Sequence, residues 1–204
     1  MSDVSSWKEV KTKMWARVKD IEKEIPGYDY SETHHMIVTD DKVKDMFILE
    51  LRKSKKTLFN VLETAYEQQK EGMTKDLHKL RDDVDIFLDE VKVKHPVKWP
   101  ESIPQEFLEK IVTHDSDILK ELPKLNAKLE EIAKLLLDIE KERAGAVPYD
   151  REQADRLHRN VSEAKKLADG LVRLFKEREL LINLKHLRRE HDYEELRGGM
   201  ETTY

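Results

Sequence analysis

Two short clusters in this sequence combine side-chain types that could bind a metal ion or catalyse hydrolysis. The first is the pair His34-His35, which is followed by Asp40 and Asp41. A metal ion needs ligands that converge on one point, and adjacent histidines without further ligands at helical spacing do not supply that geometry. We therefore expect no metal site, and no other feature of the sequence indicates a cofactor.

The second cluster is His114-Asp115-Ser116-Asp117, which contains the residue types of a hydrolase triad. Triad members are brought together by the tertiary fold rather than by adjacency in the chain. Asp115 and Ser116 are also favoured at the start of a helix, so the sequence predicts that they cap one. We expect no catalytic residue, no small-molecule substrate and no enzymatic activity. The alternative to a non-catalytic protein is a metal-dependent or hydrolytic enzyme.

The stretch between residues 173 and 189 carries a local excess of positive charge. Its basic residues are Arg173, Lys176, Arg178, Lys185, Arg188 and Arg189. A basic helix face can contact the phosphates of nucleic acid or of anionic lipid, but the carboxyl end of a helix also favours cations. Because the net charge of the chain is −5, we do not expect either as the main partner. Binding of an anionic membrane or nucleic acid, with contacts from Arg173, Lys176, Arg188 and Arg189, is the alternative function.

Apolar residues at alternating intervals of three and four predict the helices that position these groups. Similar runs begin near Trp7, Phe47, Met73 and Ala154, and strand patterns are nearly absent. The clearest run consists of Ile118, Leu122, Leu125, Leu129, Ile132, Leu136 and Ile139. The sequence therefore predicts an all-α fold, an elongated helical bundle of long, coiled-coil-like helices without a sheet.

Proline and glycine residues indicate the expected domain boundaries. The expected parts are an N-terminal helical segment at 1–95, a proline-rich linker at 96–104, a C-terminal helical segment at 105–197 and a frayed tail at 198–204. Within the N-terminal segment we expect helices at about 5–25 and 41–95 and a linker at 26–40. Thr39 or Asp40 should cap the second helix. Gly72 interrupts its apolar run, so residues 41–95 form either one helix, which we favour, or a hairpin.

The composition of the chain bears on its expected subcellular localisation. Charged residues make up 40% of the chain, and cysteine is absent. No apolar run approaches the roughly 20 residues that a membrane-spanning helix needs, and the amino terminus lacks the apolar stretch of a signal peptide. A chain without cysteine fits a reducing compartment. We expect a cytoplasmic protein.

Consecutive apolar residues widen two of the predicted stripes. Residues 135–137 and 180–182 each place three apolar side chains in a row, more than one neighbouring helix can cover. Either these helices pack on two sides within the chain, or they form a docking surface. The candidate partner-binding residues are Leu135, Leu137, Leu180, Leu181 and Trp99. The expected function is a non-catalytic scaffold or adaptor that binds or spaces protein partners through apolar helix faces, with a homodimer as one option.

Several segments resemble the tail region of dynein heavy chains, just ahead of the linker of the motor. Residues 51–58 and the sequence Leu-Arg-Asp-Asp-Val-Asp-Ile-Phe at 80–87 look like a paired helical stretch of axonemal dynein tails, although Lys55 replaces the tryptophan of the family. Three later segments also resemble the family: Asp155-Arg156-Leu157, Phe175 to Leu181, and Asp192-Tyr193-Glu194-Glu195-Leu196. They are similar to the part of dynein tails that leads into a leucine-rich turn and a Tyr-x-x-Leu element. The resemblance implies a non-catalytic tail piece that contacts other chains of a motor assembly.

Overall fold

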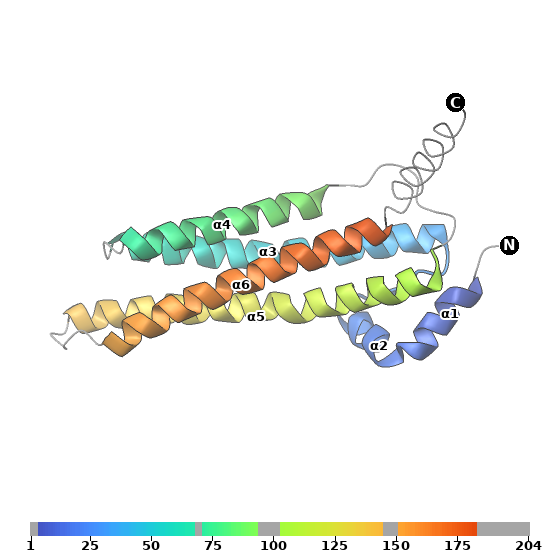
Figure 1. Cartoon of the computed structure of the whole chain (residues 1–204), viewed down its shortest axis with the longest axis horizontal. Coiled ribbons are helices and arrows are strands. Elements are labelled where there is room, and N and C mark those ends of the chain that lie inside the picture. The colour runs from blue at the N-terminus through green and yellow to red at the C-terminus, as the bar shows by residue number, and fades with distance from the viewer. Residues whose placement is uncertain (1–3, 68–70, 94–102, 145–150, 183–204) are drawn as a thin grey trace, which may run out of the picture. The chain divides into compact units, whose positions relative to one another are not determined.

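The computed structural model describes residues 4–67, 71–93, 103–144 and 151–182, and all regular structure in these ranges is α-helical (Figure 1). The helices are α1 (Val4–Lys13), α2 (Trp15–Glu24), α3 (Thr33–Glu67), α4 (Glu71–Lys92), α5 (Gln105–Ala144) and α6 (Arg151–Ile182). The prediction of an all-α helical bundle is confirmed for this part of the chain. Most of the 96–104 linker and the segment from 183 to the tail lie outside the described residues.

The chain divides into two compact units that combine segments far apart in sequence. Unit 1 comprises residues 1–41, 96–116 and 175–204, and unit 2 comprises residues 42–95 and 117–174. These units differ from the predicted segments 1–95 and 105–197. The difference arises because helices remote in sequence pack side by side, which the positions of proline and glycine do not reveal.

In unit 2, α3 and α4 form an antiparallel hairpin (Figure 1). The Nζ atom of Lys55 lies 2.6 Å from a carboxylate oxygen of Asp85, and the Tyr66 hydroxyl is hydrogen-bonded to the His78 ring. In one continuous helix, Lys55 and Asp85 would be about 45 Å apart. The favoured expectation of a single helix over 41–95 is therefore wrong, and the hairpin alternative is correct. Gly72 lies inside α4 rather than between the helices.

The predicted apolar runs form the core of unit 2. Buried members include Phe47, Leu51, Leu58, Leu77, Leu80, Phe87, Leu122, Leu125, Leu129 and Leu157. Removing such a side chain from water contributes about 1.5–3 kcal/mol each before the cost of ordering the chain. The run on α3 has one polar position, Ser54, whose hydroxyl donates to Oδ1 of Asn126 at 2.6 Å. Asn126 in turn donates to Oε2 of Glu50 at 2.9 Å, so this core interior is hydrogen-bonded rather than left unsatisfied.

The N-terminal helices differ in their limits from the prediction. The expected helix at 5–25 is interrupted at Met14, which separates α1 from α2. The expected linker at 26–40 is shorter, because α3 already begins at Thr33. Thr39 and Asp40 therefore lie inside α3 and are buried, so neither caps it. Instead, the Thr39 hydroxyl donates to the Asp29 carbonyl at 2.7 Å and fixes the preceding segment against α3.

The helix α5 passes through the position where the sequence predicted a helix start. Asp115 and Ser116 lie in its interior, so their predicted capping role is wrong. Pro123 also lies inside α5. The apolar positions on either side of these residues, including Ile111 and Leu122, are completely buried. Packing of that stripe outweighs the local preference of Asp, Ser and Pro for a helix end.

Candidate functional site

A fully buried arginine is the centre of a polar cluster in unit 1. Arg178, on α6, has no exposed surface. Its Nε donates to Asp115 of α5, and its Nη1 donates to Oδ1 of Asp40 of α3 at 2.6 Å. Its Nη2 donates to the Tyr30 hydroxyl at 3.1 Å, and Nη1 also donates to the adjacent Glu179 at 2.8 Å. One guanidinium thus joins α3, α5, α6 and the segment between α2 and α3.

Three aromatic residues pack over this cluster. The Tyr28 hydroxyl donates to Oδ2 of Asp115 at 2.6 Å. The rings of Tyr28 and Tyr30 meet edge to face at 5.3 Å, and the Trp7 ring lies 6.0 and 5.8 Å from them. Such tilted and edge-to-face pairs add to the stabilisation from burial. The aromatic group therefore anchors α1 to the polar cluster.

Burial and neighbouring charges fix the protonation states of the tyrosines and the arginine in the cluster. Burial raises the pKa of Tyr28 and of Tyr30 well above the usual value, and the negative charge of Asp115 raises both further. Burial alone would lower the pKa of Arg178, but Asp115, Tyr30, Asp40 and Glu179 raise it overall. The tyrosines stay protonated and the arginine stays charged at any physiological pH. The cluster therefore acts as a fixed structural connection rather than as an acid or base.

The sequence contains a signal for this cluster that becomes apparent only when the apolar runs of different helices are compared. Three charged residues occupy core positions in apolar runs, each three or four residues from apolar neighbours on both sides. They are Asp40 between Met36 and Val43, Asp115 between Ile111 and Ile118, and Arg178 between Phe175 and Ile182. Two acids and one base at the same kind of position in three helices predict that the helices meet there, because a buried charge requires a partner.

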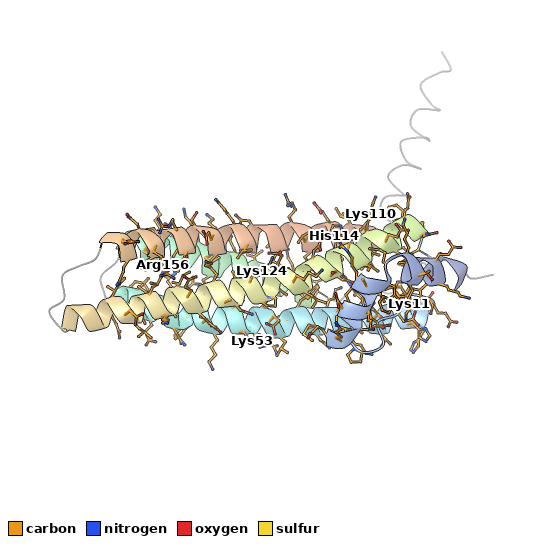
Figure 2. All side chains as sticks on the ribbon, turned by 90° about the horizontal axis from the view of Figure 1, so that it is seen from below. Lys11, Lys53, Lys110, His114, Lys124 and Arg156 are labelled. Atoms are coloured by element: carbon orange, nitrogen blue, oxygen red, sulfur yellow. The ribbon has the colours of Figure 1, made fainter. Side chains whose placement is uncertain are left out.

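The residues considered for hydrolysis do not assemble into a triad. Asp115 is occupied by Arg178 and Tyr28. His114, labelled on α5 in Figure 2, has its Nε2 4.0 Å from a carboxylate oxygen of Glu177. Ser116 is buried, and its hydroxyl has no hydrogen-bond partner among the described residues. Adjacent positions on one helix point in different directions, so His114 and Ser116 do not share a site.

The residues considered as metal ligands are also separated. Nδ1 of His35 lies 3.2 Å from an Asp29 carboxylate oxygen and 3.1 Å from the Ser31 hydroxyl. The Asp40 carboxylate belongs to the Arg178 cluster instead. Over the ranges that the structure describes, no three His, Asp or Glu side chains are grouped so that they could hold a metal ion.

The structure alters the composition of the basic segment. Arg173 and Lys176 are exposed on α6, but Arg178 is buried against two aspartates and cannot belong to an anion-binding face. Lys185, Arg188 and Arg189 lie outside the described residues. The described part of the segment therefore presents fewer surface cations than its sequence suggested.

The candidate partner-binding residues fall into three groups. Leu135 is buried in the core, so it is not available for docking, and Leu181 is half-buried. Leu137 and Leu180 are 47% and 60% exposed. Trp99 lies outside the described residues. The three leucines at 135–137 thus do not all serve one purpose: Leu135 and Leu136 are buried in the core, whereas Leu137 is exposed.

The α3–α4 hairpin presents a mixed apolar and charged surface, which the sequence analysis missed. On α3 it consists of Leu49, Arg52, Lys56 and Phe59, and on α4 and its end it consists of Asp82, Ile86, Asp89 and Val93. We call these residues the hairpin face. Its apolar members, Leu49, Phe59, Ile86 and Val93, are 51%, 65%, 55% and 56% exposed.

The two rows of the hairpin face lie on the same side of the hairpin. On α3, Lys55 and Tyr66 point towards α4, because they contact Asp85 and His78. Successive residues of a helix are rotated by 100° about its axis. On this count, the α3 row lies beside the side of α3 that faces α4 and away from the buried side of the helix. The α4 row bears the same relation to Asp85 and His78. Both rows therefore border the bridges between the helices and face outwards.

A network of ion pairs connects α5 with α6 in unit 2. Nη2 of Arg156, labelled in Figure 2, lies 2.7 Å from Oε1 of Glu131. Nζ of Lys128 lies 3.0 Å from Oε2 of Glu131 and 2.9 Å from a Glu163 oxygen. Arg156 and then Lys128 lower the pKa of Glu131 to about 2.

The depressed pKa of Glu131 predicts how unit 2 responds to acid. A carboxyl whose folded pKa is lowered stabilises the fold above its unfolded pKa, near 4.3, and loses that contribution as the pH falls towards 2. Because these groups are partly exposed, Glu131→Gln should cost only about 0.5–1 kcal/mol at pH 7 and less at pH 2. Urea denaturation at several pH values checks this. The neighbouring exposed Glu130→Gln is the control and should leave the pH dependence unchanged.

In comparisons with protein-family models, curated proteins and solved structures, nothing matched this chain. None of the helices in the described ranges combines the length and apolarity required to cross a membrane.

Proposed function

We propose that this protein is a non-catalytic helical scaffold that binds protein partners through exposed apolar helix faces. The hairpin face carries the proposal: four large apolar side chains, each more than half exposed, lie on one side of a two-helix hairpin. Isolated exposed apolar residues are common, but here four lie on one side of a hairpin among charged residues, a mixture that non-obligate protein-binding surfaces also show. Leu137 and Leu180 are further exposed apolar residues on α5 and α6.

The polar features of the protein support a structural role in preference to catalysis. The strongest cluster of ionisable groups is buried around Arg178, where every hydrogen-bonding group of the arginine is directed at the protein itself. A substrate could not reach it without unfolding of unit 1. The absence of cysteine supports a reducing compartment such as the cytoplasm. The similarity of residues 51–58, 80–87 and 175–181 to dynein tails stays a prediction and accords with a role in contacting other chains.

Comparative affinity capture tests the proposal. The tagged wild-type chain and a Leu49→Ser/Phe59→Ser variant are incubated with extract from the source cells under reducing conditions. We expect the wild type to associate stoichiometrically with a protein, either itself or another chain, and the variant to lose most of that association, because apolar anchors near the centre of an interface dominate its energy.

A matched control separates the hairpin face from the rest of the surface. The substitutions Thr64→Ser and Asp76→Ser lie on α3 and α4 outside the hairpin face, and they should leave the association intact. A wild-type chain that stays monomeric and recovers no stoichiometric protein would contradict the proposal.

A further inference from the structure

We propose that the hairpin face binds the same face of a second copy of this chain, which gives a symmetric dimer. This inference rests on the proposed function and names its partner. It starts from the distribution of charge within the hairpin face. The α3 row carries the cations Arg52 and Lys56, and the α4 row carries the anions Asp82 and Asp89, which also pair with Arg81 and Lys92 of their own helix. A surface with one positive and one negative row side by side is complementary to itself after rotation by 180°.

The bridges within the hairpin fix which residues lie at the same level. Lys55 lies beside Asp85, and Tyr66 lies beside His78. Because α3 and α4 are antiparallel, counting outwards from the two bridges fixes each level to within about one helical turn. Within that range Leu49 lies at the level of Val93, Arg52 at the level of Asp89, and Phe59 at the level of Asp82.

A two-fold axis parallel to the helices preserves these levels. Rotation about such an axis exchanges the sides of the hairpin without moving residues along it, so α3 of one copy packs on α4 of the other in antiparallel fashion. Arg52 then faces the partner's Asp89, and Leu49 faces the partner's Val93. Phe59 meets the partner's Asp82 and, within one helical turn, the partner's Ile86. The contact then combines apolar burial of Leu49, Phe59, Ile86 and Val93 with pairing of Arg52 and Asp89.

Pairing of like helices about an axis parallel to them is disfavoured. If α3 packed on α3 of the second copy in this way, Arg52 and Lys56 would face the same cations, and α4 on α4 would oppose Asp82 and Asp89 to the same anions. Like charges brought together in an interface reject that arrangement. Among dimers with a two-fold axis parallel to the helices, the charge pattern therefore favours the α3-on-α4 arrangement.

The size of the hairpin face bounds the affinity. From residue 49 to residue 59 the face is about 15 Å long, and two helices give it a width of about 20 Å. The resulting area of roughly 300 Å² per copy is well below the roughly 800 Å² of a standard stable interface. We therefore expect a weak dimer that dissociates in the upper micromolar range rather than an obligate one.

Sedimentation velocity and light scattering of the full chain, from about 1 to 300 μM, test the dimer. Wild type should change from monomer to dimer mass across this range. The variants Arg52→Glu/Lys56→Glu and Asp82→Lys/Asp89→Lys should each weaken self-association at least roughly tenfold, because each opposes like charges. An equimolar mixture should restore a heterodimer, because both of its contacts again join opposite charges.

Several results would overturn the inference. A wild type that is monomeric at the highest concentration, dimers that persist in both charge-reversed variants, or a mixture that associates no better than its components would each contradict it. Circular dichroism and urea denaturation establish that the variants are folded. If a charge-reversed variant does not fold, Phe59→Ser with Ile86→Ser removes the apolar contacts instead and should also yield a monomer. Loss of the dimer together with capture of a different protein on the hairpin face would refute this inference while leaving the proposed function in place.

Discussion

Replacing Arg178 by methionine should lower the free energy of unfolding by about 3–5 kcal/mol, the cost of breaking a buried ion pair by removing one partner. Methionine approximates the volume of the arginine stem, so the loss comes from charge rather than from a cavity. Asp40 and Asp115 would remain buried without the guanidinium that satisfies them. Urea denaturation followed by circular dichroism measures the change.

Two comparisons establish that the charge is responsible. Arg159→Met removes an exposed arginine from the same helix, and it should change stability by no more than about 0.5 kcal/mol. Adding Asp115→Asn to Arg178→Met should recover part of the loss, because it removes one of the uncompensated negative charges. If Arg178→Met unfolds no more readily than Arg159→Met, the buried cluster does not hold α3, α5 and α6 together.

The sequence predicted the type of fold because one physical effect dominates it. Alternating intervals of three and four specify which side of each helix is buried, and the runs around Leu58, Leu80 and Leu129 all form core. The same intervals do not reveal whether the chain reverses between two runs. The hairpin of α3 and α4 was therefore not distinguished from one long helix, and the bridge between Lys55 and Asp85 is what resolves it.

Local preferences predict the wrong role for a residue where tertiary packing is stronger. Asp40 and Asp115 are favoured helix caps, and Arg178 lies in a basic stretch, so each was interpreted from its neighbours in sequence. Their common property was the position within an apolar run, which required comparison across three helices. The hairpin face was missed for a related reason, since Leu49 and Phe59 alternate with the charged residues Arg52 and Lys56. It becomes visible only when the structure identifies which residues are left uncovered.

Phenylalanines 47 and 59 on α3 offer the clearest separation between folding and docking. Phe47 is completely buried, whereas Phe59 is 65% exposed. Phe47→Ala should lower the free energy of unfolding of the chain by about 3–5 kcal/mol, because it removes apolar contacts and leaves a cavity in the core of unit 2. Phe59→Ala should change the same quantity by no more than about 0.5 kcal/mol when it is measured at a concentration where the chain is monomeric.

The two substitutions should have the opposite order of effect on self-association. Phe59→Ala removes an anchor of the hairpin face and should shift the monomer–dimer transition to higher concentration, while Phe47→Ala should leave it unchanged as long as the chain remains folded. At high protein concentration, dimerisation also stabilises the wild type by mass action, so Phe59→Ala should then show a loss of stability that is absent on dilution. Urea denaturation at two protein concentrations, combined with sedimentation velocity, measures both effects. Equal destabilisation by Phe59→Ala at both concentrations would mean that Phe59 contributes to the core rather than to a docking surface.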